Sequence, residues 1–94
     1  DPDVIREFLR AFWISTAKTA SEIQAAGESR DAARIADLAH KLKAPAKSVG
    51  AMRLAEVCAE MQKAADASDF ETLGKCLPRL EAEQARVEEY LRQA

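Results

Sequence analysis

The chain has 94 residues, of which 48% are hydrophobic and 32% are charged, and its net charge is −2. This length allows one domain with one modest core, since domains cluster near ~100–150 residues. A slightly acidic chain lacks the basic surface that broad nucleic-acid binding requires, so nucleic acid is not expected as a partner. No apolar run approaches the ~18–20 residues of a membrane span, and we expect no direct membrane contact and a cytoplasmic location.

The first predicted helix runs from about Asp3 to Ala25, because apolar residues recur there at steps of three and four. Asp1 is a candidate N-cap, and Pro2 suits the first helical position, where the missing N–H has no intrahelical partner in any case. Gly27 is expected to end the helix. The residues expected to face the core are Ile5, Phe8, Leu9, Phe12, Thr16, Thr19 and Ile23.

Two shorter helices are predicted next, over residues 31–49 and 51–67, with Gly50 between them. Ser29 is a candidate cap for the first of the two, and Gly50 suits the left-handed conformation that stops a helix. The core-facing residues are expected to be Ile35, Leu38, Leu42, Ala46 and Val49 in the first, and Leu54, Val57, Cys58, Met61 and Ala65 in the second.

The fourth predicted helix opens at Ser68, which has the capping-box spacing to Glu71. Pro78 lies inside this helix and is expected to bend or split it, because proline lacks the N–H that a helix interior needs. The core-facing residues are expected to be Phe70, Leu73, Leu77, Leu80, Gln84, Val87 and Leu91.

Four amphipathic helices with short connections predict an all-α fold, an antiparallel up-down four-helix bundle, with residues 1–94 as a single domain. Cys58 and Cys76 lie within apolar helical spacings and lack the CxxC or Cys/His spacing of a metal site. We therefore expect both cysteines to be buried free thiols, and we expect no metal site.

The chain has one histidine, His40, in the middle of the second predicted helix. At about 100° per residue it falls roughly 140° from Ile35, so it lies off the core stripe. Lys43 and Lys47 follow it by one and two turns. Such cations would stabilise a negatively charged group, such as a phosphoryl group, placed on the imidazole. An ordinary solvated helix face has the same pattern, and geometry alone leaves both interpretations open.

Residues 39–51 read AHKLKAPAKSVGA. This string resembles the signature of histidine-containing phosphotransfer (HPt) domains of bacterial phosphorelays, which is roughly A-H-x-L-K-G-x-[SA]-x-x-[apolar]-G-[AL]. The opening acidic residue and first-helix Phe of that family resemble Asp3 and Phe12, and its third-helix pattern L-x-x-x-C-x-x-[LM]-[EQ] resembles residues 54–62. The resemblance covers nearly the whole chain and implies a four-helix bundle. The matching signature residues are His40, Leu42, Lys43, Ala46, Val49, Gly50 and Ala51.

The sequence departs from this pattern after Lys43, where Ala44 replaces the usual glycine and Pro45 follows. Alanine is small enough to keep the histidine approachable. Pro45 removes an amide that would bond to the carbonyl of Lys41, so a local opening of the helix is expected. The stretch from His40 to Pro45 also resembles the H-box of sensor histidine kinases, H-[ED]-[LI]-[RK]-x-P, although Lys41 stands where that motif has an acid. A kinase dimerisation hairpin and an adaptor bundle that has lost phosphotransfer are therefore the alternatives.

The HPt resemblance implies specific roles around His40. His40 would be the nucleophile that carries a phosphoryl group on Nε2 between the aspartates of receiver domains. Lys43 matches the family lysine that stabilises the negative charge of the transferring phosphoryl group, and Lys47 is expected to assist it. Gln62 matches the third-helix position that bonds Nδ1 of the histidine and so selects its tautomer. Lys41 is expected to face solvent.

The resemblance further implies a phosphoryl carrier without a kinase or ATP site of its own, so the chain is not expected to be an enzyme. It implies response-regulator receiver domains as partners, with Mg²⁺ held by the receiver and no cofactor on this chain. We expect the chain to be a monomer. Because the sequence opens without a methionine, we also expect it to be excised from, or to act beside, a hybrid histidine kinase. The docking face is expected to include Ala33, Ala36, Asp37 and Ala44, with Trp13 and Ile14 from the first helix.

Overall fold

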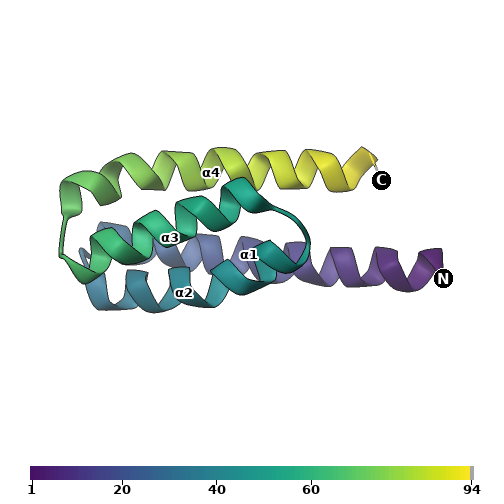
Figure 1. The fold of residues 1–94 in the computed structure, drawn as a ribbon, viewed down its shortest axis with the longest axis horizontal. Coiled ribbons are helices and arrows are strands. Elements are labelled where there is room, and N and C mark those ends of the chain that lie inside the picture. The colour runs from purple at the N-terminus through teal and green to yellow at the C-terminus, as the bar shows by residue number, and fades with distance from the viewer. Residues whose placement is uncertain (94) are drawn as a thin grey trace.

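Four α-helices make up the part of the chain, residues 1–93, that the computed structural model describes (Figure 1). Each helix packs against two neighbours, in the order α1–α2–α3–α4 and back to α1, and short turns make consecutive helices antiparallel. The predicted all-α four-helix bundle is confirmed, and Ala94, the last residue of the predicted domain, lies outside the described residues. The helices are α1 (Pro2–Glu28), α2 (Ala32–Ser48), α3 (Met52–Asp66) and α4 (Phe70–Gln93).

Aspartate side chains cap the starts of α1 and α2. The carboxylate of Asp1 accepts a hydrogen bond from the N–H of Asp3 at 3.0 Å, which confirms the predicted cap of α1. For α2 the predicted cap, Ser29, is wrong, because the carboxylate of Asp31 accepts from the N–H of Arg34 at 3.1 Å. Aspartate satisfies a free N–H at a helix start as well as serine does. Which of the two residues caps α2 therefore depends on where the chain leaves the preceding turn.

The start of α4 also differs from the predicted capping box. Ser68 has a positive φ of 53° and belongs to the turn, while the carboxylate of Asp69 accepts from the N–H of Thr72 at 3.1 Å and from its hydroxyl at 2.6 Å. These two bonds hold the pKa of the Asp69 carboxyl below its usual range. The turn between α2 and α3 follows the prediction, since Gly50 has a φ of 77°, where glycine avoids the strain of a side chain.

Gly27 does not end α1, contrary to expectation, because the helix continues to Glu28 with Ser29 at its C-cap. The position instead marks a close approach between α1 and α4. A Cβ on Gly27 would lie 2.9 Å from Cδ1 of Leu77, which is inside van der Waals contact. Glycine is therefore used here for packing rather than for a turn.

Pro45 and Pro78 lie inside α2 and α4, and both helices continue through them. Pro78 was expected to bend or split α4, and the split is absent; α2 likewise continues through Pro45, where a local opening was expected. Each proline costs one amide bond to the carbonyl four residues earlier, which belongs to Lys41 in α2 and to Gly74 in α4. Both of these residues are exposed, so water can satisfy the free carbonyl and the helix persists.

The core is made mainly of small and medium-sized apolar side chains from all four helices. Cys58 and Cys76 are buried free thiols, as predicted. Among residues 1–93, no helix combines the length and apolar character that crossing a membrane requires. The largest fully buried side chains are Ile23, Ile35, Leu54, Met61, Leu73, Leu80, Val57, Thr16, Cys58 and Cys76.

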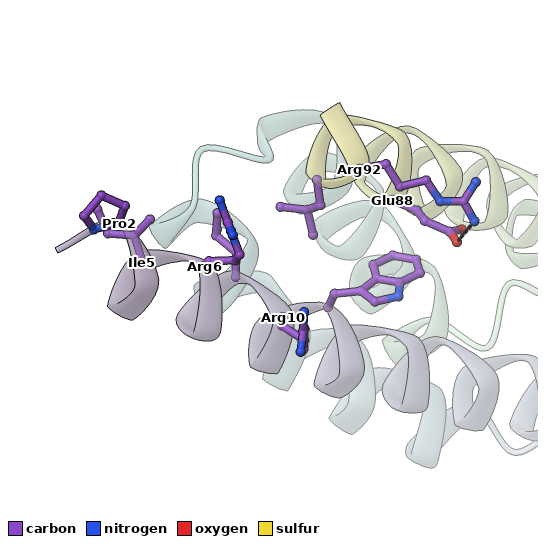
Figure 2. Close-up of a pocket in the computed structure, with 9 residues that line it drawn as sticks. Pro2, Ile5, Arg6, Arg10, Glu88 and Arg92 are labelled. Atoms are coloured by element: carbon purple, nitrogen blue, oxygen red, sulfur yellow. Dashed lines mark hydrogen bonds and ion pairs between the residues drawn. The ribbon is translucent and has the colours of Figure 1, made fainter. Parts of the chain in front are cut away.

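The N-terminal end of α1 and the C-terminal end of α4 extend beyond the turn between α2 and α3 (Figure 1). Ile5 and Phe8 were expected in the core, but they lie on this extension and are 60% and 58% exposed. The reason is that α2 and α3 are shorter than α1 and α4, so neither of these two helices covers the first turns of α1. Figure 2 shows the outer side of the extension, a groove of about 780 Å³ in which Arg92 donates to Glu88 at 2.9 Å.

Replacement of the two helical glycines, Gly27 and Gly74, by alanine distinguishes the effect of helix propensity on stability from the effect of packing. We expect Gly74→Ala to raise the free energy of unfolding by about 0.5–1 kcal/mol, because a Cβ there meets no atom within 4 Å. Gly27→Ala should gain less, since its Cβ must displace the side chain of Leu77. Urea unfolding of both variants beside the parent chain measures the difference. An equal or larger gain for Gly27→Ala would contradict the packing role of Gly27.

Candidate functional site

His40 stands on the solvent side of α2, as the helical wheel predicts. Its immediate neighbour Ala39 is completely buried, and Ile35, Leu38 and Leu42 fill the core side of the same turns. Packing of this stripe fixes the rotation of α2 about its axis. The imidazole of the one histidine in the sequence is therefore held outward by a helix that is anchored on its opposite side.

Small side chains surround His40 on the helix surface. Ala36 and Ala44 lie one turn before and one turn after it, in the same row of the helix, and Ala33 lies beside this row. Ala33 and Ala44 are exposed, and Ala36 is half-buried. A partner surface can therefore approach the imidazole without meeting a long side chain from this row.

Lys43, one turn after His40, leans toward α3. Its ammonium nitrogen donates to Oε1 of Gln62 at 3.4 Å, and both side chains are half-buried. The same ammonium lies close enough to Cys58 to oppose the effect of burial, which raises the pKa of that thiol to about 11. The lysine is thus tethered across the interface of α2 and α3, whereas Lys47, one turn further on, is exposed.

Gln62 makes a contact that the family resemblance does not imply. Its carbonyl oxygen bonds Lys43, and among residues 1–93 the structure contains no hydrogen bond between Gln62 and His40. A direct role of Gln62 toward the Nδ1 atom of His40 stays a prediction. The sequence does not predict the contact between Gln62 and Lys43, because the two residues are 19 positions apart on different helices.

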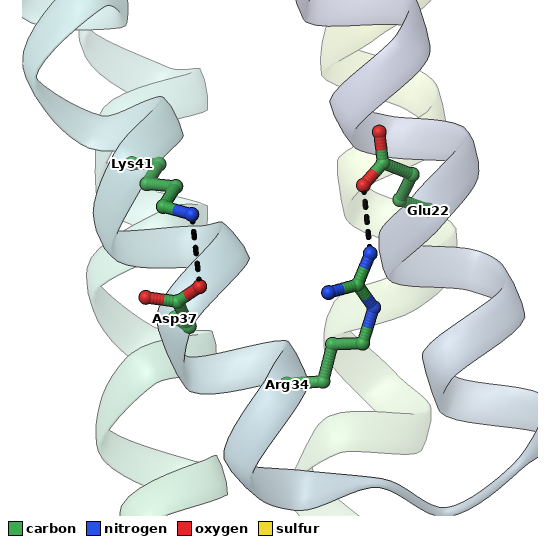
Figure 3. A network of polar contacts seen from close by, with 4 residues as sticks. All are labelled: Glu22, Arg34, Asp37 and Lys41. Atoms are coloured by element: carbon green, nitrogen blue, oxygen red, sulfur yellow. Dashed lines mark hydrogen bonds and ion pairs between the residues drawn. The ribbon is translucent and has the colours of Figure 1, made fainter.

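On the other side of His40, one ion pair lies along α2 and a second joins α2 to α1 (Figure 3). Asp37 and Lys41 pair along α2 at 3.1 Å, and Arg34 of α2 donates to Glu22 of α1 at 2.9 Å. Lys41 is exposed, as expected, but it neutralises Asp37, a residue of the expected docking face. Both pairs are solvent-exposed, so each contributes little to stability, and their effect is to leave Lys43 and Lys47 as the unneutralised charges near the histidine.

Trp13 and Ile14 occupy different sides of α1. Trp13 is half-buried and lines the groove between α1 and α4, together with Leu91 and Arg92. Ile14 is 62% exposed. The structure therefore places Trp13 against α4 rather than against α2, which carries His40. Participation of the two side chains in a docking face stays a prediction.

This arrangement provides one exposed nitrogen nucleophile and one tethered ammonium. Within residues 1–93, no group of three or more His, Cys, Asp or Glu side chains is placed to hold a metal ion. Phosphoryl transfer needs an in-line nucleophile and positive charge near the equatorial oxygens, and His40 and Lys43 are the residue types that provide these two functions. Any further groups that such a reaction needs would have to come from outside this chain.

Comparison with protein families finds that residues 7–92 match the family model of the Hpt domain. No curated protein and no solved structure matches the chain. Hpt domains act in phosphorelays as phosphoryl carriers without kinase activity, and they interact with the receiver domains of response regulators. The match spans nearly all of the four-helix bundle and favours this family over a kinase dimerisation hairpin. The chain belongs to the Hpt domain family of histidine phosphotransfer modules.

Proposed function

We propose that His40 is the phosphoacceptor of this domain and that it carries a phosphoryl group between the aspartates of two receiver domains. The observation that carries the proposal is the exposure of the chain's one histidine among small residues, one turn from a tethered lysine. An adaptor that has lost transfer is the remaining alternative, and it predicts no phosphate on His40.

In the proposed step, the lone pair of Nε2 attacks the phosphorus of an aspartyl phosphate. The new N–P bond forms as the bond from phosphorus to the carboxylate oxygen breaks, and the aspartate leaves as a free carboxylate. The reverse reaction, with the aspartate of a second receiver as nucleophile, discharges the histidine. A rigid helix favours both directions, because the imidazole needs no rearrangement to meet either partner.

Lys43 is proposed to balance the negative charge on the transferring group. Its bond to Gln62 restricts a flexible side chain, so less conformational entropy is lost when the lysine meets the phosphoryl oxygens. Lys47 is exposed and is proposed to add a weaker, more strongly screened attraction.

The partner is proposed to supply the Mg²⁺ that neutralises the acyl phosphate, with no cofactor bound to this chain. Ala33, Ala36 and Ala44 are proposed as the centre of the docking face, with Asp37 at its edge, and Trp13 and Ile14 are its proposed contribution from α1. A cytoplasmic location, beside or within a hybrid histidine kinase, fits this role.

Replacing the proposed phosphoacceptor provides the first test. We expect His40→Gln to abolish transfer from a phosphorylated receiver domain, because glutamine has no nucleophilic ring nitrogen, and to leave helicity by circular dichroism unchanged, because the side chain is exposed. The measurement is acid-labile, base-stable label on the chain after mixing with the labelled receiver. Label of this kind on the His40→Gln variant, or none on the parent chain, would contradict the proposal.

Replacing the tethered lysine tests its contribution to the rate. We expect Lys43→Ala to slow phosphoryl transfer to His40 roughly 10- to 100-fold, because a charge aimed at the transferring group is lost. Lys41→Ala is the matched control, since it removes a lysine next to His40 that is paired with Asp37, and its effect should stay within about twofold. Equal rates for both variants in rapid-quench experiments would remove Lys43 from the mechanism.

A double-mutant cycle distinguishes the two possible roles of Gln62. If Gln62 acts by holding Lys43, we expect Gln62→Ala to slow transfer in the parent chain and to have no further effect in the Lys43→Ala background. Gln62→Glu keeps an acceptor for the ammonium and should restore most of the rate. If Gln62 bonds Nδ1 of His40 instead, Gln62→Ala will slow transfer equally in both backgrounds.

A further inference from the structure

Pro45 lies inside α2, five residues after His40, and the proposed transfer step makes no use of it. Its ring nitrogen carries no hydrogen, so it cannot donate to the carbonyl of Lys41, four residues earlier. Pro45 and Lys41 are both exposed, so solvent can reach this carbonyl. A helix interior otherwise pairs each carbonyl with one of its own N–H groups. The residue next to the proposed phosphoacceptor therefore has a free main-chain acceptor.

The side chains near Pro45 do not replace the missing N–H. Among residues 1–93, no side chain donates a hydrogen bond to the carbonyl of Lys41. The ammonium of Lys41 pairs with Asp37 at 3.1 Å, and the hydroxyl of Ser48 donates to the carbonyl of Ala44 at 3.1 Å. Water is left to satisfy the carbonyl of Lys41 in the free domain.

The free carbonyl lies beside the row of small residues that contains His40. Asp37, Lys41 and Pro45 follow one another at four-residue spacing and form the neighbouring row of α2. Figure 3 shows the side chains of Asp37 and Lys41 on the flank of α2 that faces α1. A specific interface covers roughly 800 Å² of each partner, which is far wider than one helical row. A partner that docks on His40 therefore also covers the carbonyl of Lys41.

Covering this carbonyl removes its water. A buried acceptor without a partner destabilises a complex, so the docking surface must bring a donor to it. This requirement is selective, because a partner with a donor at that point gains a hydrogen bond, whereas a partner with an apolar group there is disfavoured.

We propose that Pro45 makes the main-chain carbonyl of Lys41 a recognition site for the receiver domain, which supplies an N–H or O–H donor to it. Pro45 is thus a residue that determines partner specificity, and it acts through the main chain of its neighbour. The inference rests on the proposed function, since it takes a receiver domain as the partner that docks on His40. The side chain of Lys41 has no part in it, and Lys41→Ala keeps the acceptor.

Pro78 provides a matched control within the same chain. It is also an exposed proline inside a helix, and it frees the carbonyl of the exposed Gly74 on α4. In the bundle, α4 packs on α1 and α3 and lies diagonally opposite α2 (Figure 1). Alanine at either position restores one helical N–H, but only the change at Pro45 lies on the helix that carries His40.

Binding of the receiver domain that labels His40 in the parent chain tests the inference, by isothermal titration calorimetry. We expect Pro45→Ala to raise Kd roughly 5- to 20-fold, because the new N–H at position 45 occupies the carbonyl and leaves the receiver's donor unpaired. Pro78→Ala should bind as the parent does. Thermal unfolding should show a higher midpoint for both variants, since each regains a helical hydrogen bond. Weaker binding by Pro45→Ala then cannot come from a loss of fold.

A third variant distinguishes the missing N–H from the shape of the proline ring. Replacement of Pro45 by N-methylalanine, through chemical synthesis of the chain, opens the ring but still leaves the nitrogen without a hydrogen. The carbonyl of Lys41 stays free in this variant, and we expect it to bind the receiver domain as tightly as the parent chain does.

Label at His40 together with equal or tighter binding by Pro45→Ala would overturn the inference and leave the proposed function standing. Equal weakening by Pro45→Ala and the N-methylalanine variant would also overturn it, because the ring rather than the free carbonyl would then be recognised. Equal weakening by Pro45→Ala and Pro78→Ala would contradict a local effect beside His40. Absence of label at His40 in the parent chain would instead overturn the proposed function, and the inference with it.

Discussion

The buried stripe of α2 is the constraint on which the rest of the structure depends. With Ile35, Leu38 and Leu42 packed into the core, α2 cannot turn about its axis without exposing apolar surface at a cost of about 25 cal/mol per Å². His40 is therefore presented to solvent by the packing on the opposite side of the helix. Such a fixed position suits a phosphoryl carrier, because a partner does not have to rearrange the helix before transfer.

The same packing explains why two prolines are tolerated inside the helices. Pro45 and Pro78 each remove an amide bond at an exposed carbonyl, where water replaces the lost partner, while buried residues on either side keep the helix in place. Ala33 and Ala44 are exposed and contribute little to the core, but they are strong helix formers and keep the imidazole accessible. Stability and accessibility thus come from different faces of α2.

Lys43 connects the site to the packing of α2 on α3. Its ammonium donates to Oε1 of Gln62 on α3 and opposes the rise that burial causes in the pKa of the Cys58 thiol, so its position depends on how two helices meet. The uncovered ends of α1 and α4 have a comparable origin, since they follow from unequal helix lengths in the assembled bundle. Neither feature belongs to a single helix, because both depend on how the helices of this Hpt domain are assembled.

The sequence by itself determined the four helices, the bundle, the two buried cysteines and the outward position of His40, because helical periodicity and one distinctive motif are local signals. Only the tertiary structure decided that Gly27 serves packing, that Asp31 and Asp69 are caps, that Gln62 bonds Lys43, and that Ile5 and Phe8 lie outside the core. An apolar stripe predicts which face of a helix seeks burial, but it carries no information about whether a neighbouring helix is long enough to cover it. The contact between Lys43 and Gln62 likewise depends on helix register, which is set by the packing of the whole bundle.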